Sequence, residues 1–292
     1  MRSLRKSITS TILGLFLALF LIPGTASAFL SNWYLDLDGA GPLPAVQINE
    51  FLDIVGPAYI QSTFTSPTGG TFQEWGAFKA NEHDGGASFA ATDLGYLGYE
   101  VTSVFYATGT FALDGSFSFD PGGYLDIYVN STPQFATTNG IYGANVGTLI
   151  GTFEVVGGTG SIDAAGIPNG QITTLLSSTG LTPGYWFDSN MNDLSLTDPI
   201  SWFIGFGTTN ASWIANPTTT VVNEIVGDFA NQMANYYNRP FNPANPTPSF
   251  DLVVSANGQY RVNVVPEPGT ILLLGVGLLG LAAIGRGKLR KS

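Results

Sequence analysis

The sequence predicts a mainly β fold, a single β-sandwich or jelly-roll-like domain that carries one or two helices. Charged residues make up only 11% of the chain, whereas Gly, Thr, Ser, Asn and aromatic residues are plentiful. That composition suits strands joined by turns. Several stretches alternate apolar and polar residues, as half-buried strands do, and turn residues separate them at short intervals. There is no cysteine, so core packing, sheet pairing or bound ions must hold the domain together.

The strand pattern is clearest in the middle and near the end of the chain. Asp114-Gly115, within the predicted strand segment 110–119, indicates a turn or bulge. The last segment predicts a hairpin, because Asn257-Gly258 fits a type I′ turn between Phe250–Val254 and Tyr260–Val264. The predicted strand segments are 110–119, 124–129, 149–156, 200–206 and 250–264.

One helix is predicted from Pro217 to Tyr236, because apolar residues recur there every three or four positions. A second, weaker helix is predicted from Val46 to Val55. The segment 238–248 contains four prolines and is predicted to be a loop or linker. No repeat period is visible, which argues against a solenoid.

The first 28 residues have the features of a secretory signal peptide. Arg2, Arg5 and Lys6 precede an apolar run from residue 12 to residue 22, and Ala26-Ser27-Ala28 ends the segment. A charged start, a short apolar middle and small residues before the cut are what a signal peptidase requires. The alternative is a retained membrane helix, but the apolar run is short for a span of roughly 20 residues. We expect cleavage after Ala28.

The C-terminal end has the features of a membrane anchor. An apolar stretch without any charge predicts a transmembrane helix at residues 270–285. A basic tail follows it, and such a tail stays in the cytoplasm, which places the body on the other side of the membrane. The cations of the tail are Arg286, Lys288, Arg290 and Lys291.

Pro266-Glu267-Pro268-Gly269 stands directly before this helix. The order Pro-Glu-Pro, apolar helix, basic tail resembles the PEP-CTERM sorting signal of Gram-negative bacteria that make exopolysaccharide. The resemblance covers residues 266–292 and implies that an exosortase cuts near Pro266, Glu267 and Pro268. The two prolines keep this junction extended and remove backbone donors, so it can enter a protease cleft. The alternative is a plain anchor that stays attached.

The chain therefore divides into a signal peptide at 1–28, an acidic extracellular domain at 29–265 and a sorting signal at 266–292. Seven of its 10 Lys+Arg lie in the two ends, which leaves Lys79, Arg239 and Arg261 in the body. Of 21 Asp+Glu, only Glu267 lies outside the body, so 20 acids face three bases and the net charge of the body is about −17. Such a body repels nucleic acid and attracts cations.

Two acidic loops are candidate calcium sites. The first contains Asp36 and Asp38, and the second contains Asp188, Asn190, Asn192 and Asp193. Ca²⁺ takes six to eight oxygen ligands, and alternating oxygen side chains can supply them around a loop. The second loop lacks the Gly and Glu of an EF-hand. The alternative is that Asp and Asn occur in both loops because they form turns.

No catalytic motif is visible in the body, so a non-enzyme is predicted. The lone histidine, His83, is expected to be a loop residue before a Gly-Gly turn, because no partner for a catalytic triad is visible. Aromatic rings could stack on sugars, although burial in the core is the commoner role. The aromatic candidates are Trp75, Tyr185, Trp186, Trp202 and Trp213.

The resemblance implies a surface or matrix protein that is exported, briefly anchored in the membrane and then processed. Its expected partners are signal peptidase, exosortase and exopolysaccharide, with a role in biofilm or floc formation. Two alternatives stay open. A carbohydrate-binding module would present a strip of exposed aromatic residues, and a polysaccharide hydrolase would place two carboxylates about 5 to 9 Å apart in a cleft.

Overall fold

The computed structural model describes residues 28–41, 45–85, 92–93, 98–162, 170–197, 202–213 and 251–264. Residues 29–264 form one compact unit. The described part is mainly β, which confirms the predicted fold class. One three-residue 3₁₀ helix, η2 (Leu194–Leu196), lies among the strands. The strands are β1 (Ala28–Phe29), β2 (Trp33–Leu35), β3 (Val46–Ile48), β4 (Phe51–Ser66), β5 (Gly69–His83), β6 (Thr92–Asp93), β7 (Glu100–Ala112), β8 (Ser116–Phe119), β9 (Tyr124–Asn130), β10 (Thr148–Ile162), β11 (Gly170–Leu181), β12 (Trp186–Phe187), β13 (Trp202–Trp213) and β14 (Asp251–Val264).

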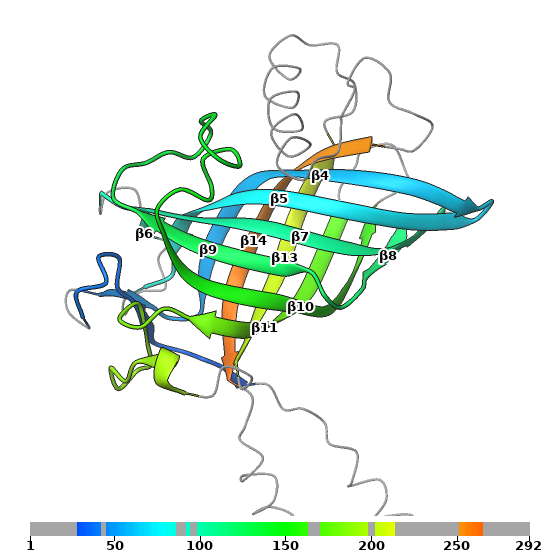
Figure 1. Ribbon diagram of the computed structural model, residues 1–292. Coiled ribbons are helices and arrows are strands. Elements are labelled where there is room, and N and C mark those ends of the chain that lie inside the picture. The colour runs from blue at the N-terminus through cyan, green and yellow to red at the C-terminus, as the bar shows by residue number, and fades with distance from the viewer. Residues whose placement is uncertain are drawn as a thin grey trace, which may run out of the picture. The chain divides into compact units, whose positions relative to one another are not determined.

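Most strands belong to one antiparallel sheet that closes on itself (Figure 1). Its order is β6-β5-β4-β14-β13-β11-β10-β8-β7-β9, and β1 pairs with β14. Of two further pairings, β5 with β7 joins the start of that order to its end, and β9 with β10 adds a second contact beside β8. The predicted sandwich has two facing sheets, whereas these strands form successive parts of one sheet. Closure follows because β5 pairs with both β4 and β7, while β8 and β9 lie one after the other between β7 and β10.

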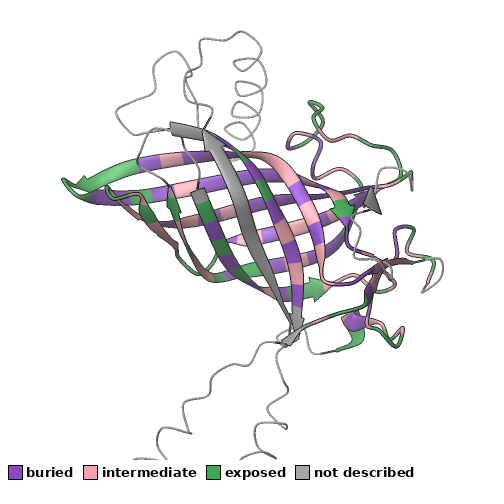
Figure 2. Ribbon diagram, turned by 180° about the vertical axis from the view of Figure 1, so that it is seen from behind, coloured by how far each residue is buried: buried purple, intermediate pink, exposed green. Residues whose placement is uncertain are grey.

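Buried and exposed residues alternate along the strands, so one face of the sheet lines a common interior (Figure 2). In β11, for example, Ile172, Thr174, Leu176 and Ser178 are buried, while residues 171, 173 and 175 are exposed. This period of two is the one expected for a strand with a single buried face. The interior is mainly aliphatic and aromatic, and it forms the main hydrophobic core.

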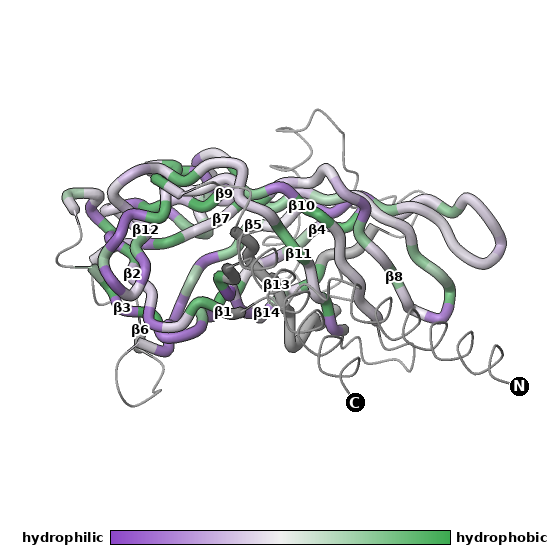
Figure 3. The backbone as a smooth tube through the Cα atoms, turned by 90° about the horizontal axis from the view of Figure 1, so that it is seen from below, coloured by the Kyte–Doolittle hydropathy of each residue, from purple (hydrophilic) through white to green (hydrophobic). Residues whose placement is uncertain are grey.

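A small second sheet, in the order β12-β2-β3, contributes to the same core. Figure 3 shows these strands near β6, at the opposite end from β8. Trp33 of β2 stacks on Trp186 of β12 with ring centroids 5.7 Å apart, and Trp186 Nε1 donates to the carbonyl of Ile150 at 2.7 Å. The two indoles therefore bind the small sheet to β10.

The outer face of the large sheet carries a second hydrophobic cluster. Tyr59, Trp75 and Val104 pack there against Ile141 and Ala144, which come from the loop between β9 and β10. We call this loop, residues 131–147, the strap. Its apolar residues cover part of the outer face, so both faces of β5 and β7 are buried where the strap lies.

Two predictions about local structure are wrong. Val46 to Val55 is not a helix but contains β3 and the start of β4, because Ile48, Leu52 and Ile54 are buried at alternating positions. Residues 251–264 are one continuous strand rather than a hairpin. Asn257-Gly258 lies in its middle, where it pairs with β4 on one side and with β13 on the other. The predicted helix at 217–236 lies outside the described residues.

The predicted turn at Asp114-Gly115 does connect β7 to β8. Asp114 Oδ1 accepts from the backbone N–H and the hydroxyl of Ser116, and Gly115 has a φ of 89°. Glycine adopts this left-handed conformation without steric cost. The strands predicted at 124–129, 149–156 and 200–206 correspond to β9, to part of β10 and to the first part of β13.

Candidate functional site

The first and last strands of the body lie side by side. β1 pairs with β14, and the backbone N–H of Leu30 donates to the carbonyl of Val262 at 2.8 Å. The predicted signal-peptide cut follows Ala28, within β1, and β14 ends at Val264, two residues before Pro266. The predicted N-terminal cut therefore divides β1, and the hydrogen bond between Leu30 and Val262 lies on the body side of both processing points.

Most residues predicted to act in processing lie outside the described part of the chain. Ala28 begins β1, whereas the others fall before residue 28 or after residue 264. Among the described residues, no helix is both long and apolar enough to cross a membrane. The transmembrane helix predicted at 270–285 lies outside those residues. The residues that stay predictions are Ala26, Pro266, Glu267, Pro268, Arg286, Lys288, Arg290 and Lys291.

The two candidate calcium loops, about 150 positions apart in the sequence, are neighbours in the fold. The first follows β2 and the second follows β12, and these strands pair. The backbone N–H of Asp36 donates to the carbonyl of Tyr185 at 2.8 Å, and that of Gly184 donates to Asp193 Oδ2 at 2.8 Å. The small sheet thus brings both loops to one region of the body.

The carboxylates of the first loop bind the loop's own backbone. Asp36 is buried, and its Oδ1 and Oδ2 accept from the N–H groups of Asp38 and Gly41. Asp38 Oδ1 accepts from Ala40 N–H. These are the local contacts that acidic residues make when they form turns.

The second loop follows the same principle. Asp188 Oδ1 accepts from the N–H groups of Asn190 and Asn192, and Asn192 Nδ2 donates to Asp188 Oδ2 at 2.9 Å. Burial tends to raise the pKa of Asp188, but the hydrogen bonds from Asn192 and Asn190 outweigh it and lower the pKa. Asp193 Oδ1 caps η2 through Ser195 N–H.

No group of three or more His, Asp or Glu side chains is placed to hold a metal ion within the ranges that the structure describes. The contacts of both loops match the turn-forming alternative. Calcium binding by Asp36, Asp38, Asp188, Asn190, Asn192 and Asp193 stays a prediction.

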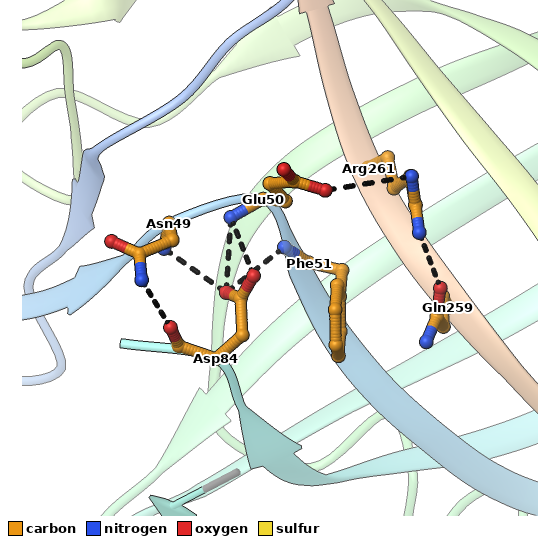
Figure 4. A network of polar contacts seen from close by, with 6 residues as sticks. All are labelled: Asn49, Glu50, Phe51, Asp84, Gln259 and Arg261. Carbon is orange, nitrogen blue, oxygen red and sulfur yellow. Dashed lines mark hydrogen bonds and ion pairs between the residues drawn. The ribbon is translucent and has the colours of Figure 1, made fainter. Parts of the chain in front are cut away.

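A buried aspartate that the sequence did not single out closes the junction of β3, β4 and β5 (Figure 4). Asp84 Oδ1 accepts from the backbone N–H groups of Asn49, Glu50 and Phe51 at 3.0 to 3.2 Å. In return, Asn49 Nδ2 donates to the Asp84 carbonyl at 2.6 Å. We call these hydrogen bonds the Asp84 cradle. Beside it, Arg261 Nη1 lies 3.7 Å from Glu50 Oε2. Asp84 therefore ties the end of β5 to the start of β4.

His83 is not the loop residue that the sequence predicts, because it is the last residue of β5 and is buried. Its Nδ1 accepts from Gly85 N–H at 2.9 Å, and its Nε2 is buried without a hydrogen-bond partner in the described residues. Burial lowers the pKa of His83, while a backbone contact with Gln47 and the charge of Asp84 act in the opposite direction. The neutral imidazole is thus favoured.

Two of the five aromatic candidates are core residues. Trp75 and Trp186 are each only 2% exposed, and Tyr185 is partly buried against the core. The side chains of Trp202 and Trp213 lie outside the described part. The role of Trp75 and Trp186 is therefore packing in the protein interior rather than stacking on a sugar.

A partly exposed aromatic row does cross the outer face of the sheet. Tyr59, Trp75, Tyr106 and Tyr124 occupy directly opposite positions on β4, β5, β7 and β9. Successive ring centroids are 5.5, 5.7 and 5.8 Å apart. Tyr106 and Tyr124, at one end of the row, are only partly buried.

Comparison with known families identifies the segment that follows β14. Residues 264–288 match the family described as the PEP-CTERM protein-sorting motif. The chain carries a PEP-CTERM sorting motif. This match confirms the resemblance drawn from Pro266, Glu267 and Pro268. No curated protein and no solved structure is significantly similar to the chain.

The PEP-CTERM motif identifies an exported protein that is sorted by an exosortase, with transient membrane anchoring before processing. The match begins at residue 264, where β14 ends. The motif thus follows the last strand of the body directly, and a cut near Pro-Glu-Pro would leave β14 intact.

Proposed function

We propose that the released body is a non-enzymatic protein of the cell surface or extracellular matrix that associates with exopolysaccharide and promotes biofilm or floc formation. The observation that carries the proposal is the PEP-CTERM motif immediately after the last strand. Because the backbone N–H of Leu30 donates to the Val262 carbonyl, a body cut after Ala28 and near Pro266 keeps its two new termini beside each other. Processing would remove the ends without opening the fold.

The polar groups of the body support a structural role. Asp36 and Asp84 are buried acids that bind backbone N–H groups, and so is Glu100. The single histidine uses Nδ1 to accept from Gly85. Its other ring nitrogen is buried, which does not suit an acid–base role on an external substrate.

A carbohydrate-binding module is the second candidate, and one observation favours it. Tyr106 and Tyr124 are partly exposed neighbours on the outer face, and Asp126 follows Tyr124 on the same face of β9. Aromatic rings beside a hydrogen-bonding side chain can bind a sugar. This candidate would supply a direct contact between the body and the polysaccharide.

The test of the primary proposal is the intact mass of the protein in cells with and without the exosortase. We expect termini near Phe29 and Pro266, and release into the matrix fraction only when the enzyme is active. Replacement of Pro266, Glu267 and Pro268 by alanine should leave the tail attached, whereas Asp120→Ala, at an exposed turn of the body, should be processed normally. A chain still joined to Lys291 in cells with an active exosortase would overturn processing.

The matrix role needs its own measurement. The processed body should co-sediment with exopolysaccharide extracted from the same cells, and cells lacking the protein should form less floc. If Tyr106→Ala and Tyr124→Ala abolish co-sedimentation, the carbohydrate-binding candidate is favoured. A body that stays entirely in the supernatant, with unchanged floc formation, would refute the matrix role while leaving the sorting result intact.

A further inference from the structure

Glu74 places a carboxyl group in the interior of the closed sheet. Like the core residues Phe72 and Phe78, Glu74 occupies one of the alternate positions of β5 that face inward, and it is only 3% exposed. On the neighbouring strands, the residues directly opposite Glu74 are Ile60 of β4 and Ala107 of β7. Both are buried, so the carboxyl lies among apolar side chains.

This carboxyl differs from the other buried acids of the body. Asp36, Asp84 and Glu100 each accept at least two hydrogen bonds from backbone N–H groups. For Glu74, no hydrogen bond or ion pair is found in the described ranges. Burial raises the pKa of Glu74 to about 8, so the group is mainly a neutral acid at pH 7. A neutral carboxylic acid has an O–H to donate.

A second polar group lies in the same interior without a partner. Thr174 of β11 is fully buried, and its Oγ1 has no hydrogen-bond partner in the described residues. A buried hydroxyl without a partner costs about 1 to 3 kcal/mol, so native structures seldom leave one unexplained.

Glu74 and Thr174 border one group of aromatic rings. We call Phe72, Phe105, Phe117 and Phe119 the phenylalanine cluster, in which neighbouring ring centroids are 5.4 to 5.9 Å apart. Glu74 is next to Phe72 on the inner face of β5. Thr174 pairs with Gly158, which in turn pairs with Phe119. Apolar walls with a few polar groups are the usual composition of a small-molecule site.

We propose that the interior of the closed sheet between Glu74 and Thr174 binds one small neutral ligand with an apolar body and a carbonyl or hydroxyl oxygen. The phenylalanine cluster contacts the apolar body, and the Glu74 O–H donates to the oxygen. Thr174 Oγ1 supplies a second hydrogen bond. Closed sheets of about eight strands have interiors that are either filled by side chains or hold one small ligand. This inference goes beyond the matrix role and does not depend on it.

The probe for this site is prodan, a neutral naphthalene that carries a propionyl carbonyl. Native mass spectrometry of the full chain, released from non-ionic detergent, counts the bound probe at a series of concentrations. We expect one prodan per chain at pH 7. Glu74→Leu should weaken binding about tenfold, as loss of one hydrogen bond predicts. Glu74→Gln should bind within about threefold of the native chain, because its amide donates in place of the acid.

Two controls separate this site from general hydrophobic binding. Glu154→Gln, on the exposed face of β10, should leave prodan binding unchanged. The parent 2-(dimethylamino)naphthalene, which lacks the carbonyl, should bind the native chain and Glu74→Leu equally, which also shows that the variant retains its interior. Absence of a one-to-one prodan complex would overturn the proposal. Equal prodan affinity in Glu74→Leu, or tighter binding at pH 10 than at pH 7, would also overturn it.

Discussion

Lys79 Nζ lies 3.6 Å from Glu100 Oε2, and this ion pair joins β5 to β7 beneath the strap. The two partners are unequal, because the Glu100 side chain is 2% exposed and that of Lys79 is 31% exposed. Glu100 Oε1 also accepts from the N–H groups of Gln134 and Phe135, both at 2.9 Å. One buried carboxylate therefore anchors the strap to the outer face and binds one of the few cations of the body.

Removing the Glu100 carboxylate should release this anchor. We expect Glu100→Ala to lower the free energy of unfolding by about 3 kcal/mol, because it leaves two strap N–H groups without their acceptor. Glu100→Gln keeps an acceptor oxygen and should cost less. Urea unfolding measures both values.

Lys79→Met is the matched control for charge. It should cost less than about 1 kcal/mol, since a partly exposed ion pair contributes little. If Lys79→Met costs as much as Glu100→Ala, the ion pair rather than the backbone hydrogen bonds holds the strap.

The Asp84 cradle should be among the most sensitive positions of the body. Asp84→Ala removes the acceptor of three consecutive N–H groups, and we expect a loss of about 3 kcal/mol in the free energy of unfolding. Asp84→Asn keeps one oxygen and should lose roughly half of that. Asp120→Ala, at an exposed position, should change stability by less than about 0.5 kcal/mol. An effect of Asp84→Ala as small as that of Asp120→Ala would show that the cradle does not determine stability.

Glu74 should make stability depend on pH. Its folded-state pKa of about 8 lies above the ordinary glutamic acid value of 4.5, so the folded protein holds this proton more tightly than the unfolded chain does. The Glu74 contribution to the free energy of unfolding therefore falls as pH rises from about 4.5 to about 8, by roughly 1.4 kcal/mol per pH unit. Below this range both states are protonated and the contribution is constant.

Glu74→Gln removes the titration while keeping a neutral polar side chain of similar shape. The difference in the free energy of unfolding between variant and native protein should therefore change by about 3 kcal/mol between pH 4 and pH 7, in favour of the variant. Urea unfolding at several pH values measures it. Parallel pH profiles for the two proteins would show that Glu74 is not buried as an uncharged acid.

The fold class was predictable from composition and alternation, because both depend on local sequence. Closure of the sheet was not, since it depends on pairings such as Trp75 with Tyr106 that no local pattern encodes. The helix predicted at Val46 to Val55 is wrong because apolar residues in so short a segment do not distinguish a helix from a strand. The alternate burial of Ile48, Leu52 and Ile54 shows which period the fold uses.

The sorting motif was predictable because its chemistry is contiguous in sequence, from Pro266 to Lys291. The buried acids were not. Asp84 meets its N–H partners 33 to 35 residues away, and Glu100 meets the strap 34 and 35 residues away. The sequence does carry a signal for Glu74. It lies between Phe72 and Phe78 in the series of alternate positions that is otherwise apolar, where a charged residue is unexpected.

The continuity of β14 makes a prediction about Asn257-Gly258. In a type I′ turn both residues have positive φ, so a β-branched residue at either position would be strained. In β14, Asn257 is exposed and Gly258 is buried between β4 and β13. We therefore expect Asn257→Thr to change the free energy of unfolding by less than about 1 kcal/mol. Gly258→Val should cost more than about 2 kcal/mol by overpacking the interior. Amide hydrogen exchange across residues 254–262 should be uniformly slow. Fast exchange confined to residues 257 and 258 would instead support the predicted hairpin.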